Sequence, residues 1–239
     1  MSPPSALRAV VFDLDGLMFN TEDLYDVVAE RLLARRGQCL TTALKRAMMG
    51  VPNPVALQMM IDAHQLPATV AELEQETEEL FAELLATQLV PLPGLETLLA
   101  ALEAATLPKA IATSSWRAYV RTVLGRFGLE PRFEFVLTSE DVVHGKPHPE
   151  IYQQAARRLG LPPFQVMVLE DSENGCRAAV AAGAFTVAVP SPHSHDHDFD
   201  GVAFIAAGLT DPRIYQALGL PLPSGTAENQ LPRPGTAEA

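Results

Sequence analysis

Apolar residues follow two different patterns along the first 90 positions of the chain. Residues 7–12 form an apolar run broken only by Arg8, and Gly16 follows shortly after, which is typical of a buried strand that ends in a turn. Between residues 20 and 90 the apolar positions instead repeat every three or four residues, the period of a helix with one buried face. We therefore predict one strand and then a helical block, with helices over 21–36, 44–49, 55–64 and about 70–85.

From residue 93 onward, short apolar runs alternate with amphipathic segments. The runs predict strands at 110–113, 133–137, 166–169 and 185–189, and the segments between them predict helices at 94–105, 117–127, 150–159 and 174–182. Strands that alternate with helices form a parallel sheet with helices on both faces, and near-continuous apolar strands agree with burial on both sides. The predicted fold class is α/β, a Rossmann-like parallel sheet with an inserted all-helical domain.

The helical block interrupts the alternation of strands and helices. The strand at 7–12 begins this alternation, which resumes only after residue 90. We therefore predict a catalytic core made of residues 1–19 and 91–223, with residues 20–90 inserted as a helical cap. The last residues, 224–239, are rich in Pro, Gly, Thr and Glu, and we expect them to form a flexible tail.

Composition limits the classes of partner and compartment. The chain has 239 residues, of which 48% are hydrophobic, so it can bury an ordinary core. A net charge of −12, with three lysines, argues against nucleic acid or an anionic membrane as the main partner, because both require a basic surface. Cys39 and Cys176 lack metal-ligand spacing and are expected to be free thiols. Without a signal peptide or membrane span, the expectation is a soluble cytoplasmic monomer.

Polar side chains suited to catalysis follow four of the predicted strands. In open parallel sheets the ligand lies beyond the carboxyl ends of the strands, so residues that follow different strands can meet there. The residues concerned are Asp13 and Asp15, Thr113 and Ser114, Lys146, and Glu170 and Asp171. Their convergence at one edge of the sheet is more specific than any single motif, and it predicts a site for a phosphorylated ligand and a cation.

The residue types suggest phosphoryl transfer. Asp13 is a carboxylate that can attack phosphorus, and Asp15 can serve as an acid and then as a base. We expect Mg²⁺ to be held by Asp13, Asp171 and the backbone carbonyl of Asp15, because this cation prefers oxygen ligands. Glu170 is either a further ligand or the residue that orients a bound water, and the sequence leaves both possibilities open.

The phosphate itself requires positive charge and hydrogen-bond donors. Lys146 supplies the charge, while Thr113, Ser114 and nearby backbone N–H groups supply donors to the phosphoryl oxygens. The helix that begins near Ser115 is expected to direct its positive end toward the same point. His193, His195 and His197 alternate in the last part of the chain; such a cluster either binds a transition metal or forms a solvated loop, and the loop is favoured.

Four motifs in order resemble those of the haloacid dehalogenase superfamily of phosphohydrolases. They are 13–16 (Asp-Leu-Asp-Gly), Thr113 in 111–115, Lys146 in 145–147 and Glu170-Asp171 in 170–175. The helical insertion is similar to the cap of the branch that contains β-phosphoglucomutase, phosphoglycolate phosphatase and pseudouridine-5′-phosphatase. The resemblance implies a Mg²⁺-dependent enzyme with Asp13 as nucleophile, Asp15 as general acid/base and a cap that opens and closes over the site.

The chain departs from this family pattern at three positions. Asn20 replaces the usual acidic residue before the cap threonine, and Tyr25 and Asn53 occupy the places where β-phosphoglucomutases carry His and Arg. Those two residues would hold a bisphosphate intermediate, so their replacement favours hydrolysis over mutase action. The predicted function is a phosphatase for a small phosphate ester, such as a sugar phosphate or nucleoside monophosphate. A sugar phosphomutase is the alternative, and a non-catalytic phosphate-binding protein is the third hypothesis.

Overall fold

The computed structural model describes residues 7–48 and 53–223 of the chain. The chain divides into two compact units, Asn20–Val90 and the remainder, which consists of Met1–Phe19 and Pro91–Ala239. The expected tail at 224–239 and the residues between the second and third helices lie outside the described part.

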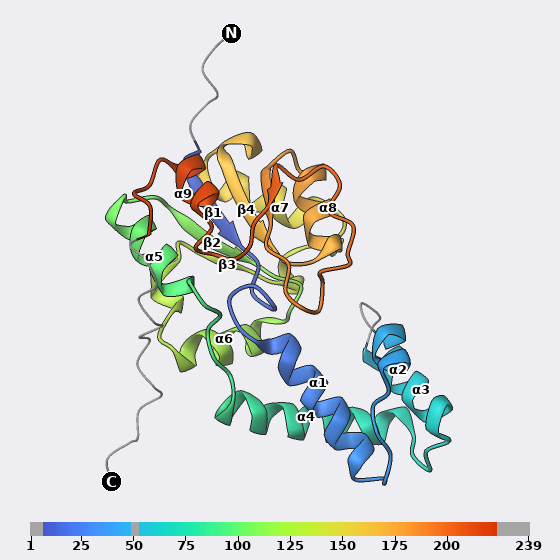
Figure 1. Ribbon diagram of the computed structural model, residues 1–239. Helices are drawn as coiled ribbons and strands as arrows, with labels where there is room; N and C mark the ends of the chain where they lie inside the picture. The colour runs from blue at the N-terminus through green and yellow to red at the C-terminus, as the bar shows by residue number, and fades with distance from the viewer. Residues whose placement is uncertain (1–6, 49–52, 224–239) are drawn as a thin grey trace, which may run out of the picture. The chain divides into compact units, whose positions relative to one another are not determined.

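A parallel sheet forms the centre of the larger unit. Among the described residues, six strands lie in the order β3-β2-β1-β4-β5-β6, and every pairing between neighbours is parallel (Figure 1). The strands are β1 (Ala9–Phe12), β2 (Lys109–Ala112), β3 (Val136–Leu137), β4 (Val166–Glu170), β5 (Phe185–Ala188) and β6 (Phe204–Ile205). The predicted α/β fold class is confirmed.

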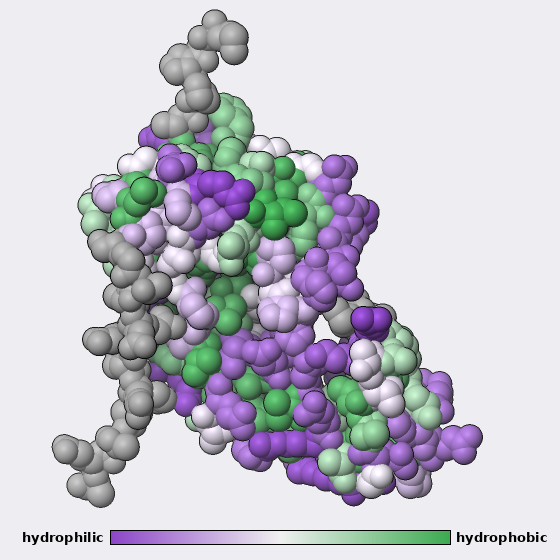
Figure 2. Space-filling view, viewed as in Figure 1, coloured by the Kyte–Doolittle hydropathy of each residue, from purple (hydrophilic) through white to green (hydrophobic). Residues whose placement is uncertain are grey.

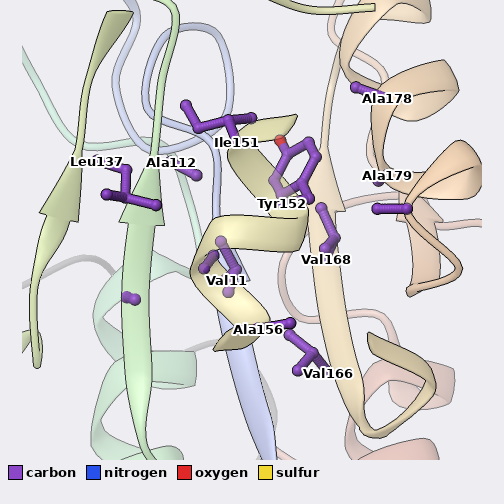
Figure 3. Close-up of a cluster of buried hydrophobic side chains, with 13 residues drawn as sticks. Val11, Ala112, Leu137, Ile151, Tyr152, Ala156, Val166, Val168, Ala178 and Ala179 are labelled. Atoms are coloured by element: carbon purple, nitrogen blue, oxygen red, sulfur yellow. The ribbon is translucent and has the colours of Figure 1, made fainter. Parts of the chain in front are cut away.

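Helices cover both faces of this sheet, as Figure 1 shows for α7 and α8 on one face and for α5 and α6 on the other. The helices of this unit are α5 (Leu95–Ala104), α6 (Arg117–Arg126), α7 (Glu150–Leu159), α8 (Glu173–Ala181) and α9 (Pro212–Leu218). A cluster of buried side chains fills the space between the sheet and α7 and α8, with Val11 and Val168 from the strands against Tyr152 and Ala178 from the helices (Figure 3).

Burial of β1 explains why its sequence is apolar without interruption. All four of its residues are fully buried. Val11 faces α7 and α8, whereas the ring of Phe12 packs edge-on against Phe133 with the ring centroids 5.9 Å apart. Since both faces of the strand are covered, a charged side chain can stand only where the strand ends, which is the position of Asp13.

The smaller unit is helical in its described part. It contains α1 (Thr21–Ala34), α2 (Thr42–Met48), α3 (Asn53–His64) and α4 (Val70–Thr87), and no strand. Thr69 and Glu72 form a capping box at the start of α4, and the apolar stripe of that helix, which includes Leu73 and Leu84, is buried. The visible face of this unit is mostly hydrophilic in Figure 2, with smaller hydrophobic patches.

Asn20 joins the two ends of the helical unit. Its side-chain Nδ2 donates to the carbonyl of Gln88 at 3.3 Å, and its Oδ1 accepts from the backbone N–H of Val90 at 2.8 Å. An amide can donate and accept at the same time, whereas an ionised carboxylate can only accept. The departure from an acidic residue at this position therefore has a structural role.

Two parts of the sheet unit differ from the sequence predictions. The predicted strand at 133–137 is reduced to Val136–Leu137, because a 3-10 turn at Glu130–Arg132 precedes it; the N–H of Glu134 still donates to the carbonyl of Lys109. Strand β6, of two residues, is too short to be predicted from a period, and helix α9 is a further element that the sequence predictions lack.

Cys39 is exposed, Cys176 is buried, and both are free thiols, as predicted. A search of the described helices for one that could cross a lipid bilayer finds none of sufficient length and apolarity.

Candidate active site

The carboxyl ends of three neighbouring strands bring the first site residues together. Strand β1 lies between β2 and β4, so Asp13, Thr113 and the last residue of β4, Glu170, stand side by side. Backbone bonds fix the first two of these positions, with Asp13 donating its N–H to Leu169 and Thr113 donating to Leu137, each at 3.0 Å. The sheet register therefore determines which side chains can meet.

Three carboxylates gather at this edge of the sheet. One oxygen from each of Asp13, Glu170 and Asp171 lies within 4.8 Å of the other two, and no other such group of potential metal ligands exists in the described part of the chain. The residues are only 7%, 0% and 6% exposed. Buried like charges are costly unless a cation or a set of donors compensates them.

Lys146 provides part of that compensation. Its Nζ donates to Asp13 Oδ1, to Glu170 Oε1 at 2.7 Å and to the backbone carbonyl of Ala112 at 3.0 Å, so each of its three N–H groups has an acceptor. Burial by itself would lower the pKa of Lys146, but the carboxylates of Asp13 and Glu170 raise it above its ordinary value. The lysine is therefore held as a cation in contact with Asp13.

One ammonium does not balance three buried carboxylates. Burial raises the pKa of Asp13 to about 8, and the negative charges of Glu170 and Asp15 act in the same direction, against the attraction of Lys146. A divalent cation at this position would restore the charge balance, and carboxylate oxygens are the ligands that Mg²⁺ prefers. The donor set thus fits the expected metal, with Asp13 and Asp171 as the natural ligands.

Glu170 is anchored by several donors. In addition to Lys146, the hydroxyl of Tyr152 donates to its Oε1 at 2.6 Å, and the hydroxyl of Ser172 donates to its Oε2 at 3.0 Å. Ser172 is also the N-cap of α8, where its Oγ accepts from the N–H of Gly175 at 3.1 Å. Glu170 therefore belongs to the carboxylate group, and its orientation is set by hydrogen bonds from Lys146, Tyr152 and Ser172.

Asp15 stands apart from the three clustered carboxylates. The hydroxyl of Ser115 donates to its Oδ2 and the hydroxyl of Tyr119 donates to its Oδ1, each at 2.6 Å. The Asp15 carboxylate is not part of this group of potential metal ligands, and contact between its backbone carbonyl and the cation stays a prediction. Sequence reasoning did not find Tyr119, which lies in the first turn of α6 (Arg117–Arg126) and reaches Asp15 from that helix.

The turn after β2 holds the expected phosphate-binding residues. Thr113 is fully buried and its Oγ1 accepts from the N–H of Ser115 at 3.0 Å, whereas Ser114 is exposed. The following helix begins at Arg117, and the N–H of Arg117 donates to Glu140 Oε1 at 3.0 Å. The N–H of Arg117 is therefore already paired with a carboxylate of the protein, and the role of this helix end toward an anionic ligand stays a prediction.

The segment that contains His193, His195 and His197 forms a loop. His195 contacts the carbonyl of Pro192 at 2.9 Å, and the Nδ1 of His197 accepts from the N–H of Glu173 at 3.4 Å. Among the described residues, the histidines do not gather with other potential ligands into a metal-binding group. This outcome agrees with the favoured interpretation of the segment as a solvated loop.

Comparison with known proteins supports the interpretation of this site. A family model described as haloacid dehalogenase-like hydrolase matches residues 10–189. A probable pseudouridine-5′-phosphatase of Drosophila melanogaster is 34% identical over 217 residues, covering 88% of this chain and 93% of that protein. A phosphorylated carbohydrates phosphatase of Thermotoga maritima is 33% identical over 181 residues, covering 74% of this chain and 82% of its own length.

A solved structure agrees with the sequence relatives. The crystal structure of a haloacid dehalogenase family hydrolase from Deinococcus radiodurans, with bound phosphate and sodium, superposes with a TM-score of 0.77 at 29% identity, covering 90% of this chain and 98% of that one. The family and its phosphatase members confirm the expected enzyme class, phosphoric monoester hydrolase. From its strand order, its clustered carboxylates and these similarities, the chain belongs to the haloacid dehalogenase-like hydrolases.

Proposed function

We propose that this protein is a Mg²⁺-dependent phosphatase that hydrolyses a small phosphorylated metabolite through an aspartyl-phosphate intermediate. The observation that carries the proposal is the position of Asp13: its carboxylate contacts Lys146 and lies within 4.8 Å of two further carboxylates at the end of the sheet. A nucleophilic carboxylate beside an ammonium and a cation site is suited to attack an anionic phosphate.

The metal would be held by the carboxylates of Asp13 and Asp171 and the backbone carbonyl of Asp15, and when bound it would supply positive charge that screens the phosphate from the nucleophile. In the first step an oxygen of Asp13 forms a bond to phosphorus while the bond to the leaving oxygen breaks. Asp15 donates its proton to that oxygen, so the alcohol leaves neutral. Lys146 and the hydroxyls of Thr113 and Ser114 stabilise the phosphoryl oxygens.

The second step regenerates the enzyme. Asp15, now a carboxylate, accepts a proton from water as the water oxygen forms a bond to phosphorus and the bond to Asp13 breaks. Inorganic phosphate leaves and Asp15 is again protonated. The separation of Asp15 from the three clustered carboxylates supports this division of roles, since its oxygens contact hydroxyl groups and not Lys146.

Substrate selection is assigned to the helical unit 20–90, acting as a cap. Relatives named for phosphorylated carbohydrates, pseudouridine 5′-phosphate and fructose 1-phosphate support a sugar phosphate or nucleoside monophosphate. Tyr25 stacks on Phe81 with ring centroids 4.3 Å apart, and Asn53 begins α3. Neither residue offers the positive charge that a bisphosphate intermediate requires, which supports hydrolysis over phosphomutase action.

Metal removal tests the proposal directly. We expect release of inorganic phosphate from members of a panel of sugar phosphates and nucleoside monophosphates in the presence of Mg²⁺. Treatment with EDTA should lower that rate at least about tenfold, since the carboxylate group then lacks the cation that screens the substrate. Excess Mg²⁺ should restore the rate, measured as released phosphate. Turnover that is unchanged by EDTA would contradict the metal dependence, and absence of turnover across the panel would favour a phosphate-binding protein.

A second assay separates hydrolysis from mutase action. The protein is incubated with a hexose 1-phosphate and a trace of the corresponding bisphosphate, and the products are followed by ³¹P NMR. Free phosphate is the expected product. Accumulation of an isomeric hexose phosphate would instead identify a phosphomutase.

A further inference from the structure

We propose that Tyr119 is a positioning residue for the general acid: its hydroxyl fixes one oxygen of Asp15 so that the other carries the proton to the leaving group. This inference rests on the proposed phosphatase function, because it assigns a role within that reaction. It concerns residues of the sheet unit alone.

The geometry places one hydroxyl on each oxygen of the Asp15 carboxylate. Tyr119 donates to Oδ1 and Ser115 donates to Oδ2, both at 2.6 Å. Two bonds to the two oxygens determine the torsion of the carboxylate as well as its position. Short bonds of this kind to a carboxylate are among the stronger hydrogen bonds in proteins.

Tyr119 is the more rigid of these two partners. It lies in the first turn of α6, is only 5% exposed, and packs against the Trp116 ring with the centroids 5.2 Å apart. Trp116 itself is 53% exposed, so this ring contact lies at the surface of the unit. The serine hydroxyl can rotate and can accept as easily as it donates. When Oδ2 of Asp15 carries the proton, the Ser115 hydroxyl can rotate away or accept a hydrogen bond from Oδ2. Tyr119 continues to donate to Oδ1 in both cases.

The positioning of Asp15 should affect the rate most for substrates whose leaving group needs a proton. In the first step the bond from phosphorus to the leaving oxygen breaks, a bond from phosphorus to Asp13 forms, and the proton on Asp15 moves to the leaving oxygen. A phenolate is a poor leaving group without that proton, whereas 4-nitrophenolate is stable without it. Misplacing the acid should therefore slow the cleavage of phenyl phosphate far more than that of 4-nitrophenyl phosphate.

The test compares kcat/KM for these two esters in wild type and in Tyr119→Phe, with Mg²⁺ present. We expect a roughly tenfold loss for phenyl phosphate, the size associated with one hydrogen bond to a charged group, and less than about twofold for 4-nitrophenyl phosphate. The two esters differ only in the nitro group, and kcat/KM reports the first chemical step for both. Ser115→Ala removes the hydrogen bond to Oδ2. It should likewise lower kcat/KM for phenyl phosphate more than kcat/KM for 4-nitrophenyl phosphate.

Tyr215→Phe is the matched control. Tyr215 is a fully buried tyrosine of the same unit, and its hydroxyl has no hydrogen-bond partner among the described residues. Its replacement should leave the ratio of the two kcat/KM values unchanged. Thermal melting of each variant checks that phenylalanine has preserved the packing, including the contact between residue 119 and Trp116.

Two outcomes would overturn the inference without affecting the proposed function. If wild type cleaves both esters and Tyr119→Phe loses activity on both by the same factor, the tyrosine acts through the general structure of the site. If neither rate changes, it does not position the acid. If wild type cleaves neither ester nor any member of the phosphate panel, the proposed function itself is wrong, and the inference fails with it.

Discussion

Replacement of Asp13 by Asn is expected to lower kcat for phosphate release by at least roughly 10⁴-fold, a loss typical of removing a catalytic nucleophile, while the protein remains folded. An amide oxygen cannot form the acyl phosphate. Folding is preserved because asparagine has the same shape as aspartate and its Oδ1 can still accept the hydrogen bond from Lys146. The rate of phosphate release and the melting temperature are measured together.

Acid quenching identifies the intermediate. Wild-type protein stopped during turnover should carry one phosphoryl group on the peptide that contains Asp13, labile to base, and the Asn variant should carry none. Asp200→Asn is the matched control, since Asp200 is an exposed aspartate of the same unit. Retention of phosphatase activity in the Asp13 variant would exclude this residue as the nucleophile.

The sheet could be predicted from the sequence because its strands are buried on both faces. Strands β1 and β4 consist of almost uninterrupted apolar runs, and Gly160 marked the end of α7, where it adopts a φ of +68°. Strand β6 is too short to show a period. Helix α9 left a signal that was overlooked: Asp211 caps it by accepting from the N–H of Arg213, and a proline and a glycine stand at its two ends.

The site residues that follow strands could be predicted from the sequence, and those that belong to helices could be predicted less well. Asp13, Glu170 and Asp171 follow strands that the apolar runs identify, so the rule for parallel sheets brings them together. Tyr119 and Tyr152 reach the site from α6 and α7. Which turn of a helix faces the end of the sheet depends on the packing angle of that helix, and periodicity contains no information about this angle.

The site leaves no room for a side chain at residue 175. A Cβ atom at Gly175 would lie 1.8 Å from Oε1 of Glu170 and 1.9 Å from its Cδ. A flexible carboxylate on the surface could move away at little cost. Glu170 is fully buried and accepts bonds from Lys146, Tyr152 and Ser172, so moving it breaks those bonds and leaves their donors unsatisfied.

Gly175→Ala is therefore expected to destabilise the fold by about 3 kcal/mol, as when a buried ion pair is broken, and to lower kcat/KM by about 10–100-fold. Denaturant unfolding and phosphate release measure the two effects.

Helix propensity alone predicts that Gly175→Ala stabilises the fold, since alanine is favoured over glycine by about 1 kcal/mol inside a helix. Gly125→Ala is the matched control for this effect of helix propensity. Gly125 lies in α6, and a Cβ added there would meet no atom within 4 Å, so its replacement should be neutral or stabilising. If the clash with Glu170 is the cause, the effects of Gly175→Ala and Glu170→Ala will not add, because the second change removes the group with which the first collides. Additive losses would show that Gly175 is required for a different reason.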